Sequence, residues 1–275
     1  MDTSRSPGPT DSSWAGEPLL AIHHLQKSFG GLKAIQDLNI QVQPNEIFAV
    51  IGPNGSGKTT LFNIISGVTP GDSGSISWQA GQDEIMGKKP WQIFRLGISR
   101  TFQNIRLSLG LSILDNVMVG LYLSTRTSWW EALLNMGRLK RRDEQARHMA
   151  MEVLEFMGPQ LARNSDRLVA ELSYPDRRRV EIARAIVSNP KLLLLDEPTA
   201  GMNTSETDEI RDEILKVNAR GVAILLIEHK MKFVSHLAKR IAVLNFGQKI
   251  AEGIYSDVRQ DENVIKAYLG SRRTD

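Results

Sequence analysis

The sequence predicts an α/β protein in which a mainly parallel sheet carries helices on its faces. Three short apolar runs indicate buried strands: Glu46–Ile51, Lys191–Leu195 and Val222–Ile227. Helix-like sequence comes before the second and the third of these runs. This alternation is typical of a parallel sheet, because a parallel connection has to cross back over the sheet. A glycine-rich stretch directly after the first run supports the same class, since such loops join a strand to a helix.

The remaining elements follow from local patterns. Four segments have helix-like sequence: Thr59–Ser66, Arg178–Ser188, Ser205–Val217 and Asp261–Leu269. The stretch from about residue 104 to residue 188 carries few strand signals, which predicts a mostly helical insertion. Ile241–Leu244 and Lys249–Glu252 flank the sequence NFGQ, a pattern typical of a β-hairpin.

Composition narrows the class of protein. The chain has 275 residues, of which 41% are hydrophobic and 24% charged, so it is long enough for one large domain or two small ones and is not disordered as a whole. A net charge of +3 does not by itself indicate a nucleic-acid binder. The absence of cysteine excludes disulfides, thiolate metal sites and cysteine nucleophiles. No run approaches the about 18 apolar residues of a membrane span, so we expect that the chain does not cross a membrane on its own.

The first 17 residues differ from the rest of the chain. They are rich in Ser, Thr, Gly and Pro and contain no apolar stretch. This composition predicts a disordered tail rather than a secretory signal.

A phosphate-binding loop follows the first predicted strand. The sequence GPNGSGKT from Gly52 matches the P-loop pattern, with a buried strand before it and a helix after it. The glycines let backbone N–H groups turn toward phosphate oxygens, and the helix N-terminus adds positive partial charge. We expect Lys58 to reach the β- and γ-phosphates of a nucleotide and the Thr59 hydroxyl to bind Mg²⁺. The predicted nucleotide-binding residues of this loop are Gly52, Pro53, Asn54, Gly55, Ser56, Gly57, Lys58, Thr59 and Thr60.

Two acids follow the second predicted strand. Four leucines place Asp196 at the carboxyl end of that strand, where open α/β sheets bind ligands. There Asp196 can hold Mg²⁺ through water, and Glu197 can orient and polarise an attacking water. The pair predicts nucleotide hydrolysis rather than transfer to a second substrate.

Three further motifs, together with these two, resemble the ATP-binding cassette (ABC) ATPase family. Arg100–Gln103 is similar to the family's Q-loop, Leu172–Tyr174 to its signature motif and Glu228–His229 to its switch histidine. The order and spacings fit from about residue 19 to residue 270. The resemblance implies a P-loop NTPase core of the RecA type, an N-terminal antiparallel β portion and a helical subdomain inserted at about 104–185, all within one domain at 18–275.

The roles of several residues are implied by this resemblance alone. Phe29 matches the aromatic residue that stacks on adenine, and Ser173 belongs to the signature that completes the ATP site of a partner subunit. Gln103 would touch Mg²⁺ or the attacking water, and His229 would contact the γ-phosphate and that water. The implied catalytic set is Glu197, His229 and Gln103, and the implied Mg²⁺ set is Thr59, Gln103 and Asp196.

Longer stretches, SFGGLKAI and LLLLDEPTAGMN among them, look like the branched-chain amino-acid importer subfamily, and an insertion near 121–149 resembles the longer of its two ATPase subunits. The resemblance implies ATP and Mg²⁺ as ligands, transmembrane permease subunits, a second ATPase subunit in a homo- or heterodimer and, indirectly, a periplasmic or extracellular substrate-binding protein, with no nucleic acid. It implies a peripheral location on the cytoplasmic face of the cell membrane. The alternatives are a urea or amide importer, a hydrolysis-impaired regulatory subunit and a soluble ABC protein without a transport role. A P-loop kinase would not explain Gln103, Ser173 and His229 together.

The signature departs from the family pattern at Pro175. The family has glycine there, whose backbone N–H helps to bind the γ-phosphate across a dimer interface, and proline has no N–H. Proline fits the first turn of a helix and Ser173 is a suitable N-cap, so we expect the helix to form. The lost donor is worth about 1.5–3 kcal/mol, which slows hydrolysis roughly 10- to 200-fold if the contact matters mainly in the transition state. Arg177 could offset part of this loss. A heterodimer would then have one competent and one weakened ATP site.

Overall fold

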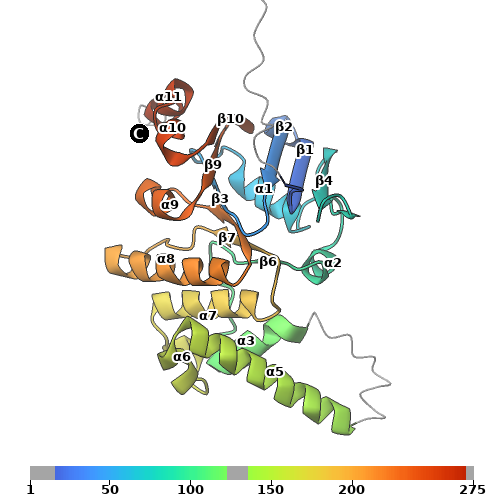
Figure 1. Cartoon of the computed structure of the whole chain (residues 1–275), viewed down its shortest axis with the longest axis vertical. Coiled ribbons are helices and arrows are strands. Elements are labelled where there is room, and N and C mark those ends of the chain that lie inside the picture. The colour runs from blue at the N-terminus through green and yellow to red at the C-terminus, as the bar shows by residue number, and fades with distance from the viewer. Residues whose placement is uncertain (1–15, 123–135, 271–275) are drawn as a thin grey trace, which may run out of the picture.

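The computed structural model describes residues 16–122 and 136–270 of the chain, and Figure 1 labels most of its elements. Its centre is a six-stranded sheet with the strand order β10-β9-β3-β8-β7-β6. The neighbouring strands of this sheet are parallel except for the β9–β10 hairpin. In sheet order the strands are β10 Gln248–Gly253, β9 Arg240–Asn245, β3 Ile47–Ile51, β8 Ala223–Ile227, β7 Leu192–Asp196 and β6 Ile98–Arg100.

A second sheet is antiparallel and lies beside the first, over helix α1. Its strand order is β2-β1-β4-β5. The strands are β1 Leu20–Phe29, β2 Leu32–Val42, β4 Ser73–Trp78 and β5 Asp83–Glu84. This sheet confirms the antiparallel portion that the family resemblance implied.

The helices fall into two groups in Figure 1, one around the central sheet and one at the end of the molecule opposite the antiparallel sheet. The first group is α1 Lys58–Ile65, α2 Pro90–Arg95, α8 Thr204–Ala219, α9 Met231–Leu237, α10 Tyr255–Val258 and α11 Glu262–Gly270. The second group is α3 Ile113–Tyr122, α5 Met136–Met157, α6 Pro159–Arg163, the short 3-10 helix η1 Val169–Glu171 and α7 Tyr174–Ile186. The second group is the predicted helical insertion.

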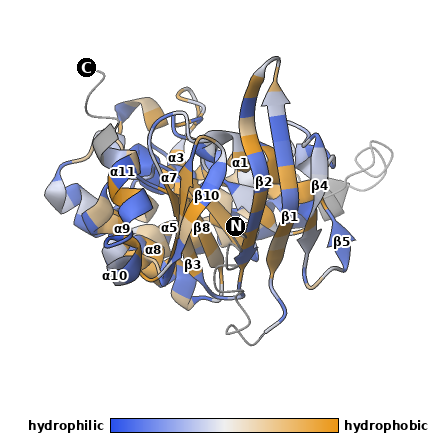
Figure 2. Cartoon of the chain, turned by 90° about the horizontal axis from the view of Figure 1, so that it is seen from above, coloured by the Kyte–Doolittle hydropathy of each residue, from blue (hydrophilic) through white to orange (hydrophobic). Residues whose placement is uncertain are grey.

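Strands β3 and β8 and the first four residues of β7 are buried on both faces, which explains why they are apolar at every position. In β3, Ile47, Ala49 and Ile51 face the core that contains the helical insertion and α8. Phe48 and Val50 face a second core, shared with α1 and the antiparallel sheet. Figure 2 shows these strands as a hydrophobic band through the middle of the protein. The two cores cover both faces of the central sheet, so polar side chains gather at the edge formed by the carboxyl ends of its parallel strands.

The predicted elements are confirmed with small shifts at their ends, except for the start of one helix. The helix-like pattern began only at Arg178, whereas Ser173 as N-cap with Pro175 in the first turn predicted an earlier start, and α7 begins at Tyr174. The reason is a cap: the Ser173 hydroxyl accepts the backbone N–H of Asp176, so the helix starts one turn before its apolar residues. The antiparallel strands and β6 have no counterpart in the local patterns.

Parts of two predictions lie outside the described residues, namely 1–15 of the expected tail and 123–135 of the expected insertion. Within the described part of the chain, none of the helices is both long and apolar enough to span a membrane.

Candidate nucleotide-binding site

The glycine-rich loop joins β3 to α1, and two of its glycines are required by the backbone. Gly57 caps α1 with a φ of 105°, and a Cβ there would lie 2.5 Å from the carbonyl oxygen of Ala34. Gly52 has a φ of 150°, and a Cβ there would collide with the carbonyl oxygen of Leu244. Because only glycine fits both positions, the loop can wrap closely around a phosphate at the start of α1.

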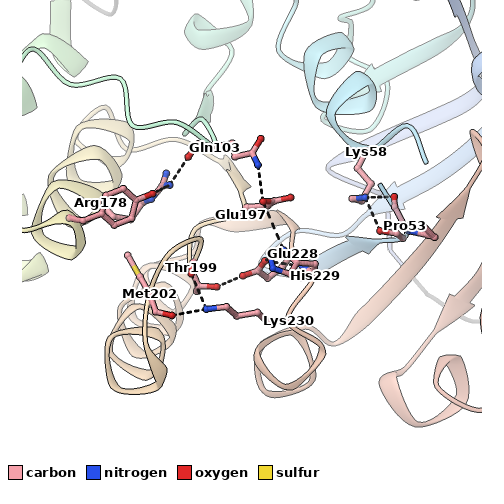
Figure 3. Close-up of polar contacts among 12 residues, drawn as sticks. Pro53, Lys58, Gln103, Arg178, Glu197, Thr199, Met202, Glu228, His229 and Lys230 are labelled. Carbon is pink, nitrogen blue, oxygen red and sulfur yellow. Dashed lines mark hydrogen bonds and ion pairs between the residues drawn. The ribbon is translucent and has the colours of Figure 1, made fainter. Parts of the chain in front are cut away.

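The Lys58 ammonium group lies inside this loop. Its Nζ donates to the carbonyl oxygens of Gly52 and Pro53, both at 2.8 Å (Figure 3). Burial lowers the pKa of Lys58, and the nearby carboxylates of Glu197 and Asp196 partly oppose that shift. A buried cation held by two carbonyl oxygens can exchange them for phosphate oxygens, which bear more negative charge.

Asp196 ends β7 at the carboxyl edge of the sheet, and a residue that we did not predict holds it. The guanidinium of Arg100, at the end of β6, donates to Asp196 Oδ2 at 2.9 Å, and both side chains are almost fully buried. Arg100 also donates to Asn63 of α1 and to Ser66, the C-cap of that helix, each at 2.8 Å. Arg100 therefore ties the acid to the helix that follows the phosphate loop. Burial lowers the pKa of Arg100, and Asp196 opposes that shift.

Glu197, Gln103 and His229 converge at the same edge, from the ends of β7, β6 and β8. Gln103 Nε2 donates to Glu197 Oε2 at 2.9 Å, and His229 Nδ1 lies 3.9 Å from the same oxygen (Figure 3). Glu197 has a φ of 47°, which is unusual for a residue with a side chain, and its N–H donates to Ile227 of β8 at 2.9 Å. These three residues, far apart in the chain, lie together at this edge of the sheet.

The backbone around Gln103 is held by the helix that follows the signature. Arg178 of α7 donates to the carbonyl oxygens of Phe102 and Gln103, both at 2.8 Å, and to Glu181 at 2.6 Å. Glu181 in turn lies within hydrogen-bond reach of the N–H groups of Phe102 and Arg106, at 3.5 and 3.3 Å. We did not predict the roles of Arg178 and Glu181. The signal was present, since they are charged residues three apart in a helix with a buried apolar face.

The other predicted residues lie away from this convergence. Phe29 ends β1, its side chain is 49% exposed, and the Lys27 ammonium lies 5.2 Å from its ring centre. Ser173 caps α7, and its hydroxyl donates to the carboxylate of Asp176 at 2.8 Å. Pro175 lies in the first turn of α7, where the structure accommodates it as expected. Arg177 donates to the carbonyl oxygen of Ala170 at 2.7 Å, so its charge is directed into its own subunit.

Oxygen donors for a cation are few at this edge. The described residues contain no group of three or more His, Asp or Glu side chains that could bind a metal ion. Magnesium at nucleotide phosphates usually takes only one or two protein ligands and completes its shell with phosphate and water. The Thr59 hydroxyl, in the first turn of α1, and the Asp196 carboxylate are hard oxygen donors of this kind, and they fit such an ion.

Comparison with known families places these motifs in context. Residues 35–200 match a family described as "ABC transporter", and residues 248–273 match one described as "Branched-chain amino acid ATP-binding cassette transporter". The chain is 38% identical over 255 residues to the high-affinity branched-chain amino acid transport ATP-binding protein LivG of Escherichia coli K12, with 92% of this chain and 98% of LivG covered. It is 37% identical to BraF of Pseudomonas aeruginosa, a protein of the same description, over 92% of this chain and 98% of BraF.

A solved structure agrees with these relatives. The ADP conformation of MJ1267, an ATP-binding cassette of an ABC transporter, superimposes with a TM-score of 0.79 at 31% identity. The match covers 92% of this chain and 99% of MJ1267.

Proposed function

The chain belongs to the ABC transporter ATP-binding family, and from this premise we propose that it is the ATP-binding and ATP-hydrolysing subunit of an importer for branched-chain or other amino acids. The observation that carries this proposal is the convergence of Gln103, Glu197 and His229 beside the Lys58 loop. A cradle for phosphates and a carboxylate poised near it are the parts that nucleoside triphosphate hydrolysis needs.

The described side chains divide the reaction between them. The loop N–H groups and Lys58 bind the β- and γ-phosphates, in exchange for the carbonyl oxygens that now hold the ammonium group. Glu197 orients and polarises the attacking water, and its partners Gln103 and His229 fix where its carboxylate lies. Phe29, at the exposed end of β1, stacks on the adenine ring.

Magnesium would be held by Thr59 and, through water, by Asp196, with Gln103 nearby. When bound, it would neutralise charge on the β- and γ-phosphates. Arg100 takes one oxygen of Asp196 and so sets the direction of the other. Residues 18–275 form the whole ABC domain in this proposal, with the helical part at about 104–185.

The chain works with permease subunits and a second ATPase subunit, as an importer ATPase of this family does. As a peripheral subunit it would bind the cytoplasmic face of the cell membrane, where ATP is supplied, and a substrate-binding protein on the other side would deliver the amino acid. Ser173 would then complete the ATP site of the second ATPase subunit.

A second candidate is a regulatory subunit with impaired hydrolysis, and Pro175 favours it. Proline offers no N–H to the phosphate of the partner's site, although the structure accommodates it in α7. In a heterodimer, this chain's own Lys58 loop would face the partner's signature, and only the partner's loop would meet Pro175. One ATP site would be competent and the other weakened.

The test is steady-state ATP hydrolysis by the chain coexpressed with its membrane partners. We compare wild type with Glu197→Gln, which removes the polarising carboxylate, and with Pro175→Gly, which restores the N–H. Wild-type turnover well above the Glu197→Gln value supports a transport motor. Turnover near that value, raised by Pro175→Gly, supports the regulatory subunit, and no turnover in any variant refutes hydrolysis. Uptake of labelled leucine and of labelled urea by the same complex in vesicles then separates the amino-acid importer from a urea importer.

A further inference from the structure

Residues 198–203 follow Glu197 and connect β7 to α8; we call them the 198–203 loop. It starts directly after the unusual backbone of Glu197, whose φ is 47°. It ends at Asn203, which caps α8 by accepting the N–H of Glu206 at 3.0 Å. A residue held in a sparsely populated conformation needs surrounding contacts to keep it there. The contacts of this loop therefore decide where the Glu197 carboxylate lies.

The ammonium group of Lys230 binds two backbone carbonyl oxygens of the 198–203 loop. Lys230 Nζ donates to the carbonyl oxygens of Thr199 and Met202 at 2.9 and 3.1 Å (Figure 3). It also donates to the hydroxyl of Thr207 in α8 at 3.2 Å. These three acceptors use all three N–H bonds of the ammonium group. Lys230 thus occupies the inside of the loop as a bound cation would, with two backbone carbonyls turned toward it.

Lys230 also stands next to the catalytic histidine in the chain. The preceding residues make two more links to the loop region: Ile227 accepts the N–H of Glu197, and the buried Glu228 accepts the hydroxyl of Thr199. His229 lies between Glu228 and Lys230, with its Nδ1 3.4 Å from Glu228 Oε2 and 3.9 Å from Glu197 Oε2. The segment 227–230 is therefore bound to the segment 197–203 on both sides of the histidine.

We propose that Lys230 is a positioning residue for ATP hydrolysis: by holding the 198–203 loop, its ammonium group keeps Glu197 and His229 at their working separation. The inference rests on the proposed function, because it assigns Lys230 a part in the chemistry of the same site. Lys230 itself does not touch the phosphates in this role. Its removal should therefore slow the chemical step without weakening ATP binding.

The experiment uses the assembled complex and the variants Lys230→Met and Lys232→Met. Methionine keeps most of the length of the side chain and removes the charge and the donors. Lys232 is the matched control, because it is an exposed lysine two residues further along the chain, in α9. We expect Lys230→Met to lower kcat for ATP at least 10-fold with KM changed less than twofold, and Lys232→Met to match wild type. An unchanged kcat, or a raised KM alone, overturns the inference.

A second control separates positioning from a general loosening of the start of α8. Asn203→Ala removes the cap of the same helix and leaves Lys230 in place. If Asn203→Ala lowers Tm as much as Lys230→Met and lowers kcat equally, Lys230 is merely structural and the inference fails. Lys230→Arg keeps the charge with planar donors, so we expect it to restore part of kcat. If Lys230→Met does not fold, Lys230→Ala replaces it, and kcat must then fall at least 10-fold for the inference to stand. Wild-type turnover equal to Glu197→Gln refutes the proposed function instead, so the two failures are distinguishable.

Discussion

Replacing Arg178 with methionine tests how firmly α7 holds the segment that carries Gln103. The guanidinium is fully buried, as is its partner Glu181, with side-chain exposures of 0% and 1%. Methionine fills similar space but leaves the carboxylate without its charge partner and two carbonyl oxygens, of Phe102 and Gln103, without their donor. Removing one partner of a buried ion pair costs about 3–5 kcal/mol. We therefore expect the free energy of unfolding to fall by about 3–5 kcal/mol at pH 7.5.

The loss should depend on pH in a definite direction. Burial raises the pKa of Glu181 in the folded protein, and Arg178 opposes that shift. Without Arg178 the folded-state pKa of Glu181 rises further above its unfolded value. As pH falls toward that raised pKa, the folded variant takes up a proton and escapes part of the penalty. The difference in stability between wild type and Arg178→Met should therefore be smaller at pH 5 than at pH 7.5.

Urea unfolding followed by circular dichroism measures both quantities. Arg177→Met is the matched control, because Arg177 is partly exposed and its guanidinium donates to the neutral carbonyl oxygen of Ala170 rather than to a buried carboxylate. We expect this variant to lose no more than about 1 kcal/mol. Arg178→Met should also lower kcat, because the Gln103 backbone is released. A stability loss below about 1 kcal/mol, or a loss that grows on acidification, would refute the reasoning.

Three further predictions concern the nucleotide site. Phe29→Ala should raise the KM for ATP several-fold, and Phe29→Tyr should not. Leu32 is the control: it is an exposed apolar residue paired with Phe29 across the β1–β2 hairpin, and Leu32→Ala should leave KM unchanged in the same assay. Gly57→Ala should abolish binding of a fluorescent ATP analogue, because its Cβ would lie 2.5 Å from the Ala34 carbonyl oxygen; Gly110→Ala, where a Cβ meets open space, should bind normally. Arg100→Met should lower the free energy of unfolding by about 3–5 kcal/mol, because it leaves the buried Asp196 carboxylate without its charge partner. In urea titrations, the double variant Arg100→Met/Asp196→Asn should lose less stability than the sum of the two single losses.

Local sequence was sufficient for the central strands and for the phosphate loop. Strands β3 and β8, and β7 up to Leu195, are buried on both faces, so these residues are all apolar and the runs are visible without any partner. The antiparallel strands were not visible in this way. Register shifts in β1, between Ile22 and Leu25 and again before Lys27 and Ser28, break the alternation that marks a strand with one buried face.

The sequence by itself determined which chemistry this chain can perform: a loop in which only glycine fits, a lysine inside it, two acids at a strand end and a proline without an N–H in the signature. These are properties of single residues and their neighbours in the chain. The tertiary structure alone decided which side chains hold that chemistry in place. Arg100 reaches Asp196 across 96 positions, Arg178 reaches Gln103 across 75 and Lys230 reaches Thr199 across 31. Such contacts depend on the packing of whole strands and helices. A local pattern can mark a charged residue on a buried helix face, as for Arg178, but it does not say which distant oxygen that residue meets.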